Sequence, residues 1–295
     1  MVQTINTFLV GAQKAGTTSL YDWLGQHPEV LAPEEIKDYH FFTNENFFKK
    51  GIKHLESFYK KETPIKLHGA VNYMYFHQTA SQRIYKYNND IRIIVCLRNP
   101  VNRAVSAYNY FKRTLREEKT FEQAINAELN GELTTFVQQS NNTYVQHGYY
   151  ARQVQSFLKK FGKKNCHFVL FEELIDTRMQ QEVMQQVCQF LGIDDDFQFS
   201  FVHLNASAQP RSKTINFIIR KSGLTKVLKP LLPLRYRKKL GKTLEQKNIG
   251  EKKINTTIEK DTIKSLKEKF LPRVEALSDV VGRDLVKFWN FRNKI

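Results

Sequence analysis

Short apolar runs alternate with longer amphipathic segments along most of this 295-residue chain. Four of the runs are typical of buried β-strands and lie near residues 5–10, 66–71, 91–97 and 166–171. The segments between them have helical spacing, and residues 256–290 finish with an amphipathic helix. Strands that alternate with helices predict an α/β fold, with one right-handed parallel sheet and helices on both of its faces.

The first strand leads directly into a turn that suits an anion. The sequence GAQKAGTTS occupies residues 11–19, and hydroxyl side chains begin the helix that follows. Backbone amides at such a helix start favour a bound anion. Gly11 and Gly16 have the spacing of a nucleotide P-loop, but Thr17 stands where a nucleoside triphosphatase has its lysine. Lys14 lies inside the loop instead, in a position suited to the last phosphate of a nucleotide.

The third predicted strand ends in a basic residue. A P-loop phosphohydrolase usually places an aspartate there to hold magnesium, whereas this chain has Arg98. This difference argues against ATP hydrolysis. The guanidinium of Arg98 can bond a second phosphate, and Ser106, two helical turns further on, can donate a hydroxyl to the same group.

Most of the positive charge is local. The formal net charge is +17, and residues 211–253 hold fourteen Lys and Arg against two Glu, a net +12. Such a concentration implies an anionic partner, which could be a phosphate-bearing cofactor, a polyanionic glycan or a membrane surface. Nucleic acid is a poorer fit, because only Phe217 and Tyr236 are interleaved with these basic residues. We expect residues 213–253 to form a basic lid or extension of a single domain spanning residues 1–295.

We expect neither a targeting segment nor a disulfide framework in this chain. Met1 leads almost directly into the first strand, and no apolar run approaches the roughly 18 residues of a membrane span. Cys96, Cys166 and Cys188 each lie in an apolar pattern without metal-ligand spacing. We therefore expect reduced core thiols and a cytoplasmic location.

Together the two phosphate motifs resemble the signature of a known family. Lys14 with the following Gly-Thr-Thr, and Arg98 with Ser106 eight residues later, are similar to the cofactor motifs of sulfotransferases that use 3′-phosphoadenosine 5′-phosphosulfate (PAPS). The resemblance covers most of the chain and is greatest to bacterial members and to heparan and other glycan sulfotransferases. Further matching stretches are HPEV, KDYHFF, GYYARQVQSFLKKF, HFVLFEEL, CQFLGI, HLNASAQPRS and VVGRDLVKFW.

The resemblance implies a set of site residues. The first loop would hold the 5′-phosphosulfate and the second motif the 3′-phosphate, with Arg211 as a third phosphate ligand. The implied cofactor-binding residues are Lys14, Ala15, Gly16, Thr17, Thr18, Ser19, Arg98, Ser106 and Arg211. Lys14 is the candidate for the contact to the leaving oxygen, and no metal is expected.

A general base is expected in KDYHFF, residues 37–42. Asp38 stands where glycan sulfotransferases have a glutamate, with the same carboxylate on a shorter arm. His40 is the alternative, since an unperturbed imidazole pKa near 6.5 suits proton transfer.

Two departures from the family pattern concern the acceptor side. Glycan sulfotransferases commonly have Glu-Lys where this chain has Ala70-Val71, so a usual basic contact is missing. Tyr73 and Tyr75 remain as candidate acceptor walls, and Phe171 is assigned no polar role.

The function predicted from these motifs is transfer of a sulfuryl group from PAPS to a hydroxyl acceptor, a glycan or glycoconjugate, in a bacterial enzyme. Two alternatives stay open. One is a P-loop kinase, which the displaced lysine and Arg98 oppose. The other is a non-catalytic polyanion-binding protein, which the basic segment permits.

Overall fold

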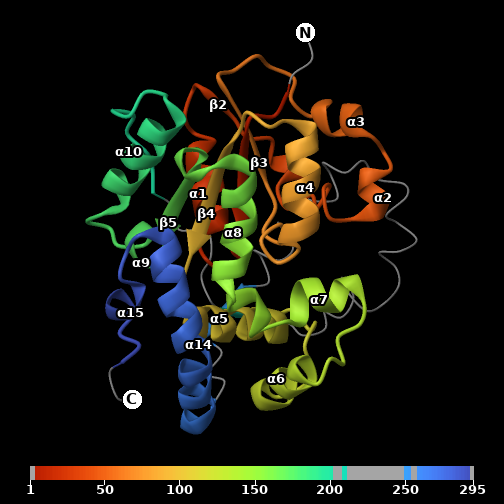
Figure 1. Ribbon diagram of the computed structural model, residues 1–295, viewed down its shortest axis with the longest axis vertical. Coiled ribbons are helices and arrows are strands. Elements are labelled where there is room, and N and C mark those ends of the chain that lie inside the picture. Colours follow the sequence, from red (N-terminus) through yellow and green to blue (C-terminus); the bar gives the residue numbers. More distant parts are fainter. Residues whose placement is uncertain (1–3, 202–207, 211–248, 254–257, 293–295) are drawn as a thin grey trace. The chain divides into compact units, whose positions relative to one another are not determined.

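A computed structural model describes residues 4–201, 208–210, 249–253 and 258–292 (Figure 1). Its main sheet is parallel, with strand order β2-β3-β1-β4-β5. The strands are β1 (Thr7–Gly11), β2 (Val30–Leu31), β3 (Ile65–Gly69), β4 (Arg92–Leu97) and β5 (Cys166–Leu170). The four predicted strands and the parallel α/β fold are confirmed, whereas β2 was not predicted.

The strand order places a switch point beside β1. After β1 the chain builds β2 and β3 on one side of it, and then crosses to build β4 and β5 on the other. Loops that leave β1 and β4 at their carboxyl ends therefore diverge, which is where open α/β sheets bind ligands. The predicted phosphate loop follows β1, and Arg98 directly follows β4.

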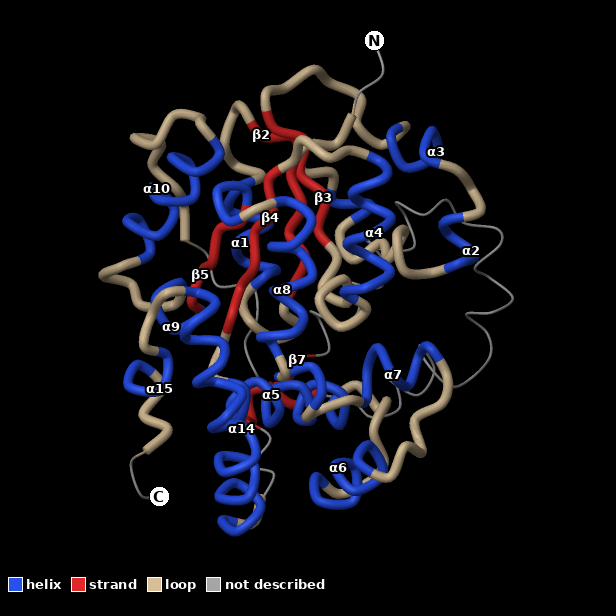
Figure 2. The backbone as a smooth tube through the Cα atoms, in the orientation of Figure 1, coloured by secondary structure: helices blue, strands red, loops and turns tan. Residues whose placement is uncertain are grey.

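Helices cover the sheet (Figure 2). The α-helices are α1 (Thr17–Leu24), α2 (Glu45–Phe48), α3 (Ile52–Glu56), α4 (His77–Tyr87), α5 (Pro100–Arg113), α6 (Phe121–Leu129), α7 (Phe136–Asn142), α8 (Tyr150–Phe161), α9 (Phe171–Leu174), α10 (Gln180–Leu191), α14 (Lys260–Val281) and α15 (Leu285–Phe288). Three short 3-10 helices are η1 (Glu34–Ile36), η2 (Gln146–Gly148) and η3 (Lys163–Asn165). Helices α4 and α8 pack side by side on the face nearest the viewer in Figure 1, and right-handed crossovers put α1 on the opposite face.

The centre of the sheet is apolar on both faces. Strand β4 has the sequence RIIVCL, and its last five residues are buried, as expected for a strand covered by helices on both sides. Cys96 on β4, Cys166 on β5 and Cys188 on α10 are buried free thiols. Burial raises the pKa of each thiol, so all three are inert at neutral pH. The expectation of reduced core cysteines is confirmed.

The chain divides into two compact units. The first contains residues 1–104, 145–204 and 263–295 and holds the main sheet. The second contains residues 105–144 and 205–262, with the antiparallel pair β6 (Ala208–Pro210) and β7 (Ile249–Lys253). Of the predicted basic lid, residues 213–248 lie outside the described residues, so the lid and the single-domain organisation stay predictions.

The second unit contains a buried carboxylate that organises its backbone. Glu117 is 9% exposed, and its Oε1 accepts the N–H groups of Glu118 and Lys119, each at 3.0 Å. Its Oε2 accepts the Tyr144 hydroxyl at 2.9 Å and the Asn142 amide at 3.0 Å. Each oxygen therefore accepts from two donors, and the lone pairs of a carboxylate are enough for all four.

Replacing Glu117 by glutamine is expected to lower the free energy of unfolding by about 2–4 kcal/mol. Either orientation of the amide puts an NH₂ group against two donors, which leaves buried donors without an acceptor. Urea titration followed by circular dichroism measures the change. Exposed Glu132 in the same unit provides the control, since Glu132→Gln is expected to change stability by no more than about 0.5 kcal/mol. Equal stability of the two variants would contradict this role of Glu117.

The C-terminal helices return to the end of β4. Helix α14 buries Leu266, Phe270, Val274 and Leu277 along one stripe, which confirms the predicted amphipathic helix. Beyond α15, the Trp289 carbonyl accepts the Asn99 amide at 3.3 Å, and its indole donates to Glu172 at 3.0 Å. Glu172 in turn accepts the Asn99 N–H at 3.0 Å. This network fixes the turn that carries Arg98.

Candidate functional site

The loop after β1 presents an anion site at the start of α1. The Leu20 N–H makes the first helical bond, to the Gly16 carbonyl at 3.1 Å, so the amides of residues 17–19 precede the hydrogen-bonded helix. Gly16 has φ 83°, and within the described residues no side chain caps these amides. Residues 17–19 are hydroxyl residues without an acid. This set of donors suits a phosphate or sulfate group.

Arg98 locks this loop onto the end of β4. Its Nη1 donates to the Lys14 carbonyl at 3.0 Å, and its guanidinium carbon lies 4.1 Å from the centre of the Phe171 ring. Phe171 also lies beneath Gly16, where an added Cβ would come within 3.0 Å of the ring. The two phosphate motifs predicted from the sequence are therefore physically joined, with Phe171 as their common support.

Arg98 keeps donors for a ligand. Its Nε is buried and has no hydrogen-bond partner in the part of the chain that the structure describes. Burial lowers the pKa of the guanidinium, and nearby Glu172 partly offsets this effect. A buried cation with an unused N–H fits a phosphate group, so the residues present are compatible with the predicted nucleotide.

Asp38 lies in a small crevice that reaches the phosphate loop. The crevice is lined by Leu9, Thr17, Tyr21, Lys37, Asp38, Gly69, Ala70 and Val71. The Asp38 backbone is left-handed, with φ 58°, and its N–H donates to the Gly69 carbonyl at 2.7 Å. The Val71 N–H donates to Oδ1 of its carboxylate at 3.3 Å. The end of β3 thus holds Asp38 beside Thr17, which lies 21 residues earlier in the chain.

Lys37 is a site residue that sequence reasoning missed. Its Nζ lies 3.0 Å from the Thr18 hydroxyl oxygen and 3.4 Å from Oδ2 of Asp38. The side chain of Lys37 is 14% exposed and that of Asp38 is 42% exposed. A lysine directly before the candidate base was the available signal, but its direction depends on the unusual backbone at Asp38.

His40 and the two candidate tyrosines lie in different surroundings. His40 is half-buried and does not line the Asp38 crevice. Tyr73 is fully buried, and its hydroxyl bonds His68 at 2.9 Å and the Tyr39 carbonyl at 3.3 Å, so it is a core residue and not an acceptor wall. Tyr75 is half-buried and stacks on His147 with ring centres 4.3 Å apart.

The structure gives no contact that tests the predicted phosphate-binding roles of Ser106 and Arg211. Ser106 is a half-buried residue of α5 in the second unit. Arg211 lies outside the described residues. Their roles stay predictions.

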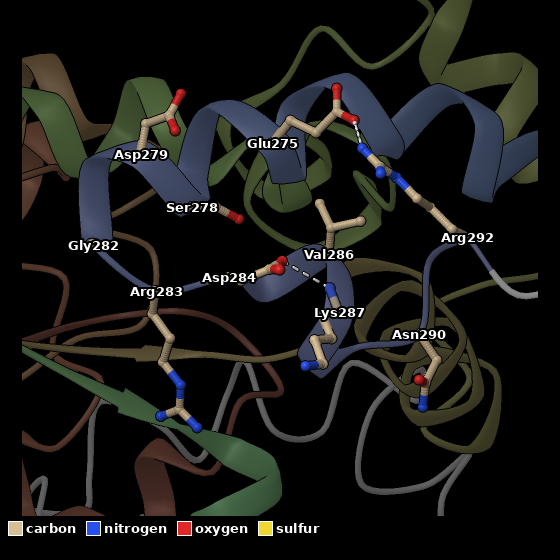
Figure 3. A pocket seen from close by; sticks show the side chains of 10 residues that line it. All are labelled: Glu275, Ser278, Asp279, Gly282, Arg283, Asp284, Val286, Lys287, Asn290 and Arg292. Atoms are coloured by element: carbon tan, nitrogen blue, oxygen red, sulfur yellow. Dashed lines mark hydrogen bonds and ion pairs between the residues drawn. The ribbon is translucent and has the colours of Figure 1, made fainter.

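A larger surface hollow lies on the C-terminal segment (Figure 3). All its lining residues fall within 275–292, and several of its charges are already paired. Arg292 donates to Glu275 at 3.1 Å, and Arg283 pairs with Glu173 of α9. No phosphate-loop residue lines this hollow, so the loop after β1, with Asp38 beside it, is the better candidate site.

The described residues contain neither a candidate membrane span nor a candidate metal cluster. No helix among them combines the length and apolar character that a membrane span requires. No group of three or more His, Cys, Asp or Glu side chains in the same residues is arranged to hold a metal ion.

The parallel α/β fold brings the predicted phosphate loop and Arg98 together at the carboxyl ends of β1 and β4. A family description, the sulfotransferase domain, matches residues 4–223. The chain belongs to the sulfotransferase family, a family of enzymes whose sulfuryl donor is PAPS. The predicted family and enzyme class are confirmed.

Curated relatives include enzymes named for heparan sulfate. Heparan sulfate glucosamine 3-O-sulfotransferase 5 of Mus musculus is 26% identical over 226 residues, covering 74% of this chain. The chain spans 62% of that relative's length. Bifunctional heparan sulfate N-deacetylase/N-sulfotransferase 1 of Homo sapiens is 26% identical over 201 residues, which are 65% of this chain and 22% of that protein.

Two solved structures share the fold. A sulfotransferase from Alicyclobacillus acidocaldarius superposes with a TM-score of 0.70 at 25% identity, covering 99% of this chain and 100% of the other. Mouse sulfotransferase SULT7A1, solved in complex with PAP, superposes with a TM-score of 0.52 at 16% identity, covering 98% of this chain and 89% of the other. The second likeness supports the fold alone.

Proposed function

We propose that this protein transfers a sulfuryl group from PAPS to a hydroxyl group of a glycan or glycoconjugate. The observation that carries the proposal is the meeting of Asp38 with the phosphate loop, through the shared crevice and the Lys37 bridge to Thr18. A candidate base next to a phosphate site is the arrangement that transfer to an alcohol needs.

The chain's own residues supply binding, charge and a proton acceptor. PAPS, when bound, supplies the sulfuryl group and an oxygen that leaves with the nucleotide. The first-turn amides of α1 and the hydroxyls of Thr17, Thr18 and Ser19 would hold its 5′ end. Arg98 would hold the 3′-phosphate, with Ser106 and Arg211 as further ligands.

Lys14 and Asp38 would divide the chemistry. The Lys14 ammonium would stabilise negative charge that develops on the leaving oxygen. The Asp38 carboxylate would accept the proton of the acceptor hydroxyl as the new S–O bond forms and the old one breaks. No metal is assigned a role, since a fixed lysine charge serves the leaving oxygen.

Arg98→Ala is expected to remove the thermal stabilisation by PAP (adenosine 3′,5′-bisphosphate). At 100 times its dissociation constant, PAP should stabilise the wild type by about 2.7 kcal/mol. Arg98→Lys should restore only part of this, because a lysine ammonium cannot reproduce the planar, forked set of donors of the guanidinium. Thermal-shift titrations with and without EDTA measure the effect.

Arg92 provides the matched control, because it lies at the opposite end of the same strand. Arg92→Ala should keep the response to PAP. Retention of the full response in Arg98→Ala would refute the assignment of Arg98, and a response to ATP with magnesium instead of PAP would reopen the kinase alternative.

The acceptor is tested with labelled PAPS and two forms of a heparosan polysaccharide, one N-sulfated and one with free amines. Relatives named for 3-O-sulfation favour hydroxyl sulfation of the first polymer. Transfer to the amine form alone would redirect the proposal toward N-sulfation. Tight binding of either polymer without any turnover would favour the polyanion-binding alternative.

A further inference from the structure

Lys37 connects the phosphate loop to the candidate base. Its ammonium lies 3.0 Å from the Thr18 hydroxyl and 3.4 Å from the Asp38 carboxylate. With 14% of its side chain exposed, it lies deeper than Asp38, of which 42% is exposed. A lysine in such a position is fixed between two partners instead of extending into solvent.

The chemistry of the two groups decides the direction of the Thr18 hydrogen bond. An ammonium group has three donors and no acceptor, whereas a hydroxyl has one donor and two lone pairs. Thr18 must therefore accept from Lys37, and its own O–H is left to donate elsewhere. Because Thr18 lies in the first turn of α1, beside the amides that suit an anion, that O–H can serve the same anion.

Asp38 holds the ammonium in place. The carboxylate is itself fixed on two sides, by the Val71 N–H on Oδ1 and by Lys37 on Oδ2.

Lys37 also carries charge that its neighbours lack. Among the described residues that line the crevice, Lys37 is the only cation, and positions 70 and 71 are alanine and valine. Because the Asp38 carboxylate pairs with this ammonium, Lys37 acts on an anion in the loop chiefly through the Thr18 hydroxyl.

We infer that Lys37 is a positioning residue, which turns the Thr18 hydroxyl into a donor for the 5′-phosphate end of the nucleotide. This inference rests on the proposed function. It predicts that Lys37 and Thr18 act on nucleotide binding as a pair, and only on nucleotides that carry a 5′-phosphate.

The test is a double-mutant cycle on affinity, measured by calorimetry. Lys37→Met, which keeps an unbranched side chain, is expected to weaken PAP binding about tenfold. In the Thr18→Val background the same change should weaken PAP binding by no more than about twofold, because the hydroxyl is gone. Binding of adenosine 3′-phosphate, which lacks the 5′ group, should change within about twofold in every variant. Lys53→Met, an exposed lysine on α3, is the control that should leave PAP affinity unchanged.

The outcomes separate the inference from the proposed function. The inference alone is overturned if the wild type binds PAP and Lys37→Met weakens that binding by the same factor with Thr18 present and in the Thr18→Val background. Equal weakening of PAP and adenosine 3′-phosphate also overturns it, since a general loss of folding or charge would act on both. No PAP binding by a folded wild type overturns the proposed function and, with it, the inference.

Discussion

Asp38→Asn is expected to lower kcat for sulfuryl transfer by about 10²- to 10⁴-fold, the usual contribution of a general base. PAP affinity should stay within about twofold, because the phosphate ligands are untouched and the asparagine amide oxygen can still accept from Lys37. The substitution suits this test structurally, since Asp38 has φ 58° and asparagine adopts left-handed backbone as readily as aspartate. Single-turnover kinetics with labelled PAPS and an accepted glycan, together with PAP calorimetry, measure both quantities.

His40→Ala is the comparison variant for the base. His40 lies outside the crevice, so kcat should fall less than about tenfold, well below the loss for a missing base. A near wild-type rate for Asp38→Asn, with activity abolished in His40→Ala, would assign the proton transfer to the histidine.

Lys14→Met is expected to lower kcat by about 10²- to 10³-fold, as when a preorganised donor to a developing negative charge is lost. PAP affinity should fall less, by about tenfold, since the charge on the leaving oxygen is largest in the transition state. The carbonyl of residue 14 still accepts from Arg98 in the variant, so the loop should keep its path. Pre-steady-state rates and PAP binding separate the two effects.

Lys164→Met provides the matched control on an exposed residue of η3 and should leave both quantities unchanged. If Lys14→Met lost affinity and kcat by the same factor, Lys14 would be a general phosphate ligand without a special role at the leaving oxygen.

The hydrophobic periodicity predicted most strands of the sheet, and the strand and strand end that it missed have physical reasons. Strand β4 was evident because a continuous β-branched run is typical of a strand buried on both faces. Strand β2 contains only Val30 and Leu31, too few residues for any period to appear. Strand β3 ends at Gly69, before the expected limit of 71, because Ala70 begins the turn toward α4 and its carbonyl accepts the Tyr73 N–H.

The sequence predicted many of the residues at the candidate site but not the contacts between them. The Lys14 and Arg98 motifs were recognised separately, but the bond from Arg98 to the Lys14 carbonyl depends on the path of the loop backbone, which side-chain types do not encode. Lys37 was missed for a similar reason. Neighbouring side chains of an extended chain point to opposite sides, and the left-handed backbone at Asp38 breaks that alternation, so that both residues line one crevice.

The three buried thiols can report how often the folded protein opens. Cys96 on β4 is fully buried, and its carbonyl accepts the Ala12 N–H at 2.7 Å, so the structure around β4 must open before a reagent can reach that sulfur. The rate of alkylation of Cys96, followed by mass spectrometry, would then measure how often this region opens in the native protein. A nucleotide seated across the loop should slow the labelling of Cys96 more than that of Cys188 on α10, so the unmodified chain can report where a ligand binds.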